Sequence, residues 1–155
     1  MKTEESNKES NEVVVILPYV KNKILMQLRD EKQNIVFPGM WGMFSGSIHI
    51  GESPNKAAFR EIKEEICYQP IAMMQLSTDS IRDQNNICSH SFFCKLTTEI
   101  NKIKLREGID LGLFTLDEIK SGKLYSKRFD RFFSVIPSEY IPYIITRLMN
   151  VLNNK

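Results

Sequence analysis

A chain of 155 residues is long enough to bury a hydrophobic core in one domain without disulfide or metal staples. Its 42% hydrophobic and 26% charged residues are ordinary for a soluble globular protein. The formal net charge of +2 comes without a dense Lys/Arg cluster, so the sequence does not support a nucleic-acid-binding or membrane-binding surface.

The three cysteines, Cys67, Cys88 and Cys94, are odd in number and lack the close pairing of a zinc site. We interpret them as buried free thiols in a reducing compartment. The N-terminal residues lack the apolar core of a signal peptide, and no stretch approaches the length of a membrane span. A cytoplasmic location is therefore expected.

The first half of the chain predicts a polar tail followed by strands. Residues 1–11 are polar and mixed in charge and are expected to be a disordered tail, and residues 12–155 to form one domain. The apolar, β-branched runs at residues 12–19 (EVVVILPY) and 23–29 (KILMQLR) predict two strands. Residues 30–39 are expected to be a loop that closes at Pro38-Gly39.

Glycines interrupt the extended residues 41–48, which indicates that the backbone there comes close to another group. Ser53 and Pro54 then predict the start of a helix, with serine as N-cap and proline at the first helical position. This helix is expected to run to about Ile66, because Pro70 opposes its continuation.

The second half of the chain predicts strands and then helices. Three strands and one short helix are expected, near residues 71–83, 87–97, 112–115 and 116–120. From about Tyr125 to residue 153 the pattern is interpreted as a helical C-terminal segment. Its clearest part is an apolar stripe, formed by Ile141, Ile144, Ile145, Leu148 and Leu152. The stripe either packs onto the domain or forms the surface of a homodimer, and the order of elements predicts an α+β or mixed layered domain.

The helix that begins near Ser53 carries a cluster of glutamates. At 100° per residue, Glu61, Glu64 and Glu65 fall on one arc, separate from the apolar arc of the helix. Like charges at i, i+4 repel by a few tenths of a kcal/mol, roughly, and a divalent cation would remove that cost. Mg²⁺ prefers oxygen ligands, although E-x-x-E-E alone is more often a solvated acidic face.

The segment from Gly46 to Tyr68, GSIHIGESPNKAAFREIKEEICY, fits G-x5-E-x7-R-E-U-x-E-E-x-G-U at all defined positions but one, where U is a bulky apolar residue. The matching residues are Gly46, Glu52, Arg60, Glu61, Ile62, Glu64, Glu65 and Tyr68. This segment resembles the Nudix box, and the resemblance extends over about residues 13–120. It implies a Nudix-type α/β/α sandwich with a mixed central sheet, to which the C-terminal helices are an addition.

The resemblance also implies a metal site. In the family, the residues at Glu61 and Glu65 are direct ligands of Mg²⁺, for which Mn²⁺ can substitute. Glu64 is a third ligand or binds through water, and the backbone carbonyl of Ser45 commonly joins them. The metal neutralises a diphosphate and activates water.

Further catalytic roles follow from the same resemblance. Arg60 is expected to pair with Glu52 and to hold the loop against the helix. The general base is either Glu64 or Glu107, which lies in the tripeptide Arg-Glu-Gly; an ordinary loop charge is nearly as good an interpretation of Glu107.

The one mismatch with the box is Cys67, where the family has a glycine that ends the helix in a left-handed turn. Either the loop closes differently here or the protein tolerates roughly 1 kcal/mol of strain.

Substrate-binding candidates lie around the box. They are Arg29, in the QLRD run that resembles the family's approach to the box, the aromatic residues Phe37, Trp41 and Phe44, and His49. The three rings could stack on a base, although core packing is the more common role of such residues. His49 could approach a substrate phosphate.

The substrate itself is less well defined by the sequence. Asp83, Gln84 and Asn85 occupy the region where ADP-ribose and dinucleoside-polyphosphate subgroups have a proline or tyrosine, and the NADH and coenzyme A signatures are missing. These features favour a nucleoside triphosphate, a modified nucleotide or a nucleotide sugar as the small-molecule substrate. The alternative is a nucleotide-sensing module without turnover, against which the retention of all four box glutamates argues.

Overall fold

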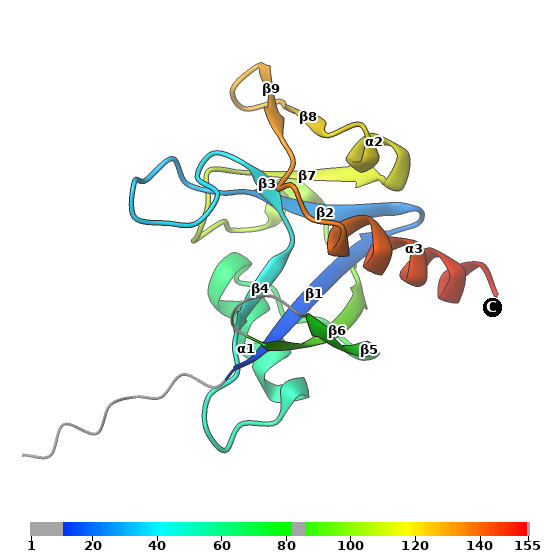
Figure 1. Ribbon diagram of the computed structural model, residues 1–155. Coiled ribbons are helices and arrows are strands. Elements are labelled where there is room, and N and C mark those ends of the chain that lie inside the picture. The colour runs from blue at the N-terminus through cyan, green and yellow to red at the C-terminus, as the bar shows by residue number, and fades with distance from the viewer. Residues whose placement is uncertain (1–10, 82–85, 155) are drawn as a thin grey trace, which may run out of the picture.

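The computed structural model describes residues 11–81 and 86–154. Within them, seven strands form one mixed sheet in the order β3-β2-β1-β6-β5, with β4 paired to β1 and β7 paired to β2 (Figure 1). The strands of this sheet are β1 (Glu12–Val20), β2 (Lys23–Leu28), β3 (Trp41–Gly42), β4 (Phe44–Ser47), β5 (Met74–Ile81), β6 (Ile87–Lys95) and β7 (Asp110–Thr115). The pair β1–β6 is parallel and the other pairs are antiparallel.

Helices cover both faces of the sheet. The other elements are α1 (Pro54–Ile66), a 3-10 turn at Ile100–Lys102, α2 (Leu116–Lys120), the hairpin β8 (Lys123–Ser126) and β9 (Arg131–Ser134), and α3 (Tyr140–Asn153). Val14 and Ile16 of β1 pack with α1, whereas Leu17 packs with α3. This alternation follows from the two-residue period of a strand. The α+β sandwich with a mixed central sheet is therefore confirmed.

The first half of the domain follows the pattern of the sequence closely. The strands near residues 12–19 and 23–29 are β1 and β2, and α1 ends at Ile66 as expected. The side chain of Ser53 accepts a hydrogen bond from Lys56 N, and Pro54 is the first helical residue. Residues 1–10 of the expected tail lie outside the described residues, while Asn11 accepts a hydrogen bond from Cys88 N.

The expectation of a helical segment from about Tyr125 is wrong for residues 125–139. The end of β8 and all of β9 lie there, and the helix begins only at Tyr140. The physical reason is a two-residue period: Leu124 and Phe133 are buried in the core, whereas Tyr125 and Phe132 on the same hairpin are exposed. That alternation is typical of strands.

The apolar stripe of α3 packs inside the domain. Ile141, Ile144, Ile145 and Leu148 are at most 4% exposed and contact the face of the sheet opposite α1. The packing interpretation of the stripe is confirmed, so the stripe does not supply the surface of a homodimer. In the part of the chain that the structure describes, no helix has both the length and the apolar character needed to cross a membrane.

Candidate active site

A clamp of one arginine and three glutamates fixes the loop before α1. Arg60 Nε and Nη2 donate to the two carboxylate oxygens of Glu52, each at 2.8 Å, and Nη2 also donates to the carbonyl of Ser47. Its Nη1 reaches Glu61 at 2.8 Å and Glu64 at 3.4 Å. Hydrogen bonding by Arg60 lowers the pKa of Glu52 to about 2, so Glu52 is ionised at neutral pH. The pairing of Arg60 with Glu52 is thus present and bidentate.

Glu61 lies against the backbone of β4. A side chain at Gly46 would overlap the carboxylate of Glu61, so only glycine leaves room for it. Burial raises the pKa of Glu61, and hydrogen bonding by Arg60 opposes that shift. The close approach that the glycines of residues 41–48 predicted is therefore that of a carboxylate at Gly46, whereas at Gly42 it is that of the side chain of Ile136.

Glu65 is the most buried carboxylate of the site. It is only 5% exposed, and its Oε2 has no hydrogen-bond partner among the described residues. Burial, together with the charges of Glu61 and Glu107, raises its pKa to about 9, although the charge of Arg29 opposes this shift. A buried carboxylate without a partner is costly unless a positive charge compensates it. The donor set therefore fits a divalent cation that is held by oxygen ligands.

The loop that carries Glu107 is tied to the end of α1. The backbone N–H groups of Arg106 and Glu107 donate to the carbonyl of Glu65, at 2.8 and 3.4 Å. Gln27 Nε2 donates to the carbonyl of Glu107 at 2.5 Å. Gly108 has a φ of +86° and lies close to the carbonyl of Leu28, where a side chain would clash. These contacts bring a residue 42 positions further along the chain to the buried carboxylates of α1.

A cavity of about 540 Å³ opens beside these carboxylates. It is lined by Gln27, Arg29, Asp30, Lys32, Ile35, Ser45, Glu65, Arg106, Glu107 and Gly108. Its volume lies within the usual range for small-molecule sites. Cationic side chains and carboxylates share its wall, an arrangement that suits a ligand with phosphate groups and a bridging metal ion.

The comparisons with known proteins agree with this geometry. The family model of the NUDIX domain matches residues 10–133. The chain belongs to the Nudix family.

Solved structures show the same fold at low sequence identity. The Nudix domain of Shewanella oneidensis NrtR, complexed with ADP-ribose, is 17% identical, with a TM-score of 0.63 over 91% of this chain and 87% of that one. A MutT protein from Methanosarcina mazei Go1 is 17% identical, with a TM-score of 0.64 over 93% of this chain and 95% of that one. The E. coli dihydroneopterin triphosphate pyrophosphohydrolase is 18% identical, with a TM-score of 0.56 over 70% and 83%. No curated protein matches the sequence.

Proteins of the Nudix family are generally hydrolases that use divalent metal ions. In this Nudix protein, the expected ligands Glu61, Glu65 and Ser45 lie on α1 and the adjoining β4. Glu65 and Ser45 line the cavity. The side chain of Glu64 is 55% exposed, pairs with Arg60 at 3.4 Å and is not among the residues that line the cavity. Glu64 therefore points more to solvent than the other two glutamates.

The aromatic substrate candidates divide into two groups. Trp41 and Phe44 have no exposed surface and belong to the core, so neither ring is accessible to a base. Trp41 Nε1 donates to the carbonyl of Leu124 at 3.0 Å, and its ring meets Phe114 edge to face. The core-packing interpretation holds for both. Phe37 is 40% exposed, in the loop before β3.

The remaining candidates are held by local contacts. Arg29 lines the cavity and donates from Nε to the carbonyl of Val36, so its loop is fixed next to the site. His49 is exposed, and its backbone N–H donates to Glu52 at 3.1 Å. Asp83, Gln84 and Asn85, which the sequence placed at a substrate-determining position, lie outside the described residues.

Sequence reasoning missed several cavity residues. Gln27, Lys32 and Arg106 line the cavity, and Asp30 accepts a hydrogen bond from Gly108 N at 3.3 Å. In the sequence, Arg106 is next to Glu107 and Asp30 is next to Arg29, and this adjacency was the only sequence feature that pointed to either residue. Their meeting depends on the pairing of β2 with β7, which places Leu28 opposite Asp110.

Cys67 ends α1 in the left-handed conformation that a glycine adopts in other Nudix boxes. Its φ is 52° and its ψ is 31°, and its N–H donates to the carbonyl of Lys63 at 3.0 Å. The loop therefore closes in the usual way, and the protein tolerates the strain of a non-glycine residue there. The thiol is exposed.

Proposed function

We propose that this Nudix protein hydrolyses a diphosphate linkage in a nucleoside diphosphate derivative with the help of Mg²⁺. The observation that carries the proposal is the carboxylate of Glu65, which is buried, lacks a hydrogen-bond partner among the described residues and faces a cavity beside Glu61 and Glu107. A purely structural glutamate would not be kept in so unfavourable a place. A metal ion removes the penalty.

The residues of the proposed active site have separate roles. Glu61, Glu65 and the carbonyl of Ser45 would hold the cation, with Glu64 as a further ligand through water. When bound, Mg²⁺ neutralises the diphosphate oxygens and lowers the pKa of a coordinated water. Arg60 and Glu52 keep the ligand helix and the preceding loop in register, because their bidentate pair spans both.

Between the two candidate bases, the geometry favours Glu107. It lines the cavity next to Glu65, whereas Glu64 is half exposed and engaged by Arg60. Glu107 therefore accepts the proton of the attacking water. The guanidinium groups of Arg29 and Arg106 and the ammonium group of Lys32 bind the phosphate oxygens, which attract cations.

The substrate class is a nucleoside triphosphate, a modified nucleotide or a nucleotide sugar. The cavity volume of about 540 Å³ suits a nucleotide. The complex of the NrtR Nudix domain with ADP-ribose makes this nucleotide a necessary member of any substrate panel. The same complex, in which a Nudix domain binds ADP-ribose, is the reason to retain a second candidate function, a nucleotide-binding module without turnover.

The test is phosphate or pyrophosphate release from such a panel in the presence of Mg²⁺. Glu65→Gln is expected to lower turnover by orders of magnitude and to leave the thermal midpoint of the metal-free protein unchanged or slightly raised, because glutamine has nearly the same shape as the protonated carboxyl group that the raised pKa favours. Glu99→Gln is the matched control, since Glu99 is an exposed glutamate outside the cavity that forms an ion pair with Lys102. Full activity of Glu65→Gln would refute the metal assignment, and nucleotide affinity without turnover would favour the binding module.

A second comparison separates the two candidate bases. Glu107→Gln is expected to lower kcat by orders of magnitude while the affinity for Mn²⁺, measured by calorimetry, stays nearly unchanged. Glu64→Gln is expected to weaken turnover less. The reverse order would assign the base to Glu64.

A further inference from the structure

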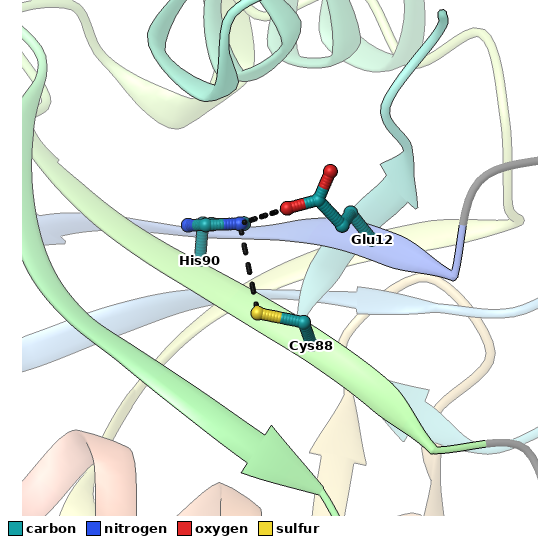
Figure 2. Close-up of side chains that lie close together, drawn as sticks. All are labelled: Glu12, Cys88 and His90. Carbon is teal, nitrogen blue, oxygen red and sulfur yellow. Dashed lines mark hydrogen bonds and ion pairs between the residues drawn. The ribbon is translucent and has the colours of Figure 1, made fainter.

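A group of side chains of the types that can bind a metal ion lies on β1 and β6, in residues that the Nudix box does not include. Figure 2 shows Glu12, Cys88 and His90 pointing toward one another. Their ligand atoms, a carboxylate oxygen, a thiol sulfur and an imidazole nitrogen, all lie within 4.8 Å of one another. The cysteines lack close zinc-type pairing in the sequence, but here one of them meets a histidine and a carboxylate in space.

The strand register explains this meeting. Cys88 and His90 are two residues apart on β6, so both side chains point to the same face of the sheet. In the parallel pair of β1 with β6, Glu12 lies directly opposite Cys88. The ligands therefore come from two strands near the centre of a seven-stranded sheet, a rigid support for a metal site.

The two distances from His90 to the other ligand atoms are close to those that a tetrahedral ion imposes. His90 Nε2 lies 3.1 Å from Glu12 Oε1 and 3.7 Å from Cys88 Sγ. With zinc–ligand bonds of roughly 2.0–2.3 Å at tetrahedral angles, the corresponding separations are about 3.4 Å for N···O and about 3.6 Å for S···N. Both separations from His90 are therefore within a few tenths of an ångström of the tetrahedral values, while the carboxylate of Glu12 and the thiol of Cys88 lie within 4.8 Å of each other.

The ring of His90 is also oriented for binding. Its Nδ1 lies 3.2 Å from Thr78 Oγ1 on β5. When Nδ1–H donates to that hydroxyl, the lone pair is on Nε2, the nitrogen that faces Glu12 and Cys88. The side chain of His90 is only 12% exposed, whereas that of Glu12 is 51% exposed, so an ion would have a fixed inner ligand and an open outer side.

We propose that Glu12, Cys88 and His90 form a zinc site. Thiolate and imidazole ligands favour Zn²⁺ over Mg²⁺, which prefers six oxygen ligands. Binding converts the thiol of Cys88 into a thiolate and releases one proton to solvent. With three protein ligands, the fourth position is left to water or to a small exogenous ligand. The metal links β1 to β6 at the end of the sheet where both strands begin.

The site is tested with Co²⁺ as a spectroscopic probe, on the full chain freed of metals by a chelator. Excess Mg²⁺ is present throughout, so that the oxygen ligands of the Nudix box are occupied. We expect an absorption band of thiolate-to-cobalt charge transfer that saturates at one Co²⁺ per chain and disappears when Zn²⁺ is added. The band is diagnostic, because the carboxylate site of the box contains no sulfur ligand.

Single-residue variants test which side chains bind the ion that gives the charge-transfer band. Cys88→Ser is expected to abolish the charge-transfer band. His90→Gln is expected to weaken the affinity for Co²⁺ by roughly tenfold or more. Thr78→Val is expected to weaken this affinity roughly tenfold, because Thr78 orients the ring of His90. Cys67→Ala is the matched control, since its thiol is exposed and lies outside the cluster, and it is expected to keep the full band.

The thermal midpoint gives an independent measurement. Zn²⁺ is expected to raise it in the wild type and in Glu65→Gln, but not in Cys88→Ser, because only a folded-state site shifts the unfolding equilibrium. The metal-free midpoint of Cys88→Ser reports whether this variant folds. Absence of the band in the wild type, its survival in Cys88→Ser, or its loss in Cys67→Ala would overturn the proposal. In the first case Glu12 and His90 form a hydrogen bond without a metal ion.

Discussion

Replacing Cys67 by glycine is expected to stabilise the protein. Cys67 has a φ of 52°, and its side chain is exposed, so its removal sacrifices little buried surface. The left-handed conformation costs a non-glycine residue roughly 1–2 kcal/mol. Glycine in turn loses more backbone entropy on folding, roughly 0.5–1 kcal/mol relative to alanine. The difference leaves a net gain of about 0.5–1 kcal/mol, which corresponds to a rise of about 1–4 °C in the thermal midpoint for a chain of this length.

Urea denaturation under reducing conditions measures this gain directly. Cys67→Ala is the matched control, because it removes the sulfur but keeps the β-carbon that is disfavoured at positive φ. We expect no stabilisation from Cys67→Ala and an unchanged denaturant slope for both variants. If Cys67→Ala stabilised as much as Cys67→Gly, the thiol and not the backbone would be the source of the gain. A loss of stability in Cys67→Gly would refute the strain argument altogether.

Three further predictions concern the box and the core. The pKa of Glu52 is lowered from 4.5 to about 2 by Arg60, so its stabilisation is complete above pH 4.5 and is lost as the pH falls to about 2. The difference in unfolding free energy between the wild type and Glu52→Gln should therefore shrink over that interval, and a difference independent of pH would contradict the pairing. Gly46→Ala displaces Glu61 and is expected to weaken Mn²⁺ binding, measured by calorimetry, by roughly tenfold or more; unchanged affinity would remove Glu61 from the ligand set. Ile144→Ala should cost about 2–5 kcal/mol in urea denaturation, since Ile144 is fully buried, and a cost below about 1 kcal/mol would mean that α3 is not part of the core.

Local signals in the sequence predicted the elements that depend on neighbours in the chain. Ser53 and Pro54 start α1 because a serine cap and an N-terminal proline act within one turn. The apolar stripe of α3 is buried as its helical period required. The hairpin of β8 and β9 was missed, because its short alternation lies in a charged, aromatic stretch that also suits a helix, and only its packing against the core decides between the two.

The substrate-binding residues were harder to predict, because the role of each candidate also depends on distant parts of the chain. Trp41 and Phe44 are aromatic residues next to the box, and their sequence positions suit either a stacking platform or a core. Their complete burial follows from which face of the sheet each side chain takes, and α3 and the β8–β9 hairpin cover the face of Trp41. Both covering segments begin more than 50 residues after the end of the box.

The sequence by itself determined the carboxylate arc of α1 and its family, since a helix places residues three and four apart on one side whatever surrounds it. The Nudix box is local in that sense, and even the strain at Cys67 could be expected from it. Only the tertiary structure placed Glu107 and Arg106 beside Glu65, and Glu12 beside Cys88 and His90. Those contacts depend on strand register and loop closure, which are set by the packing of the whole domain and not by the spacing of residues along the chain.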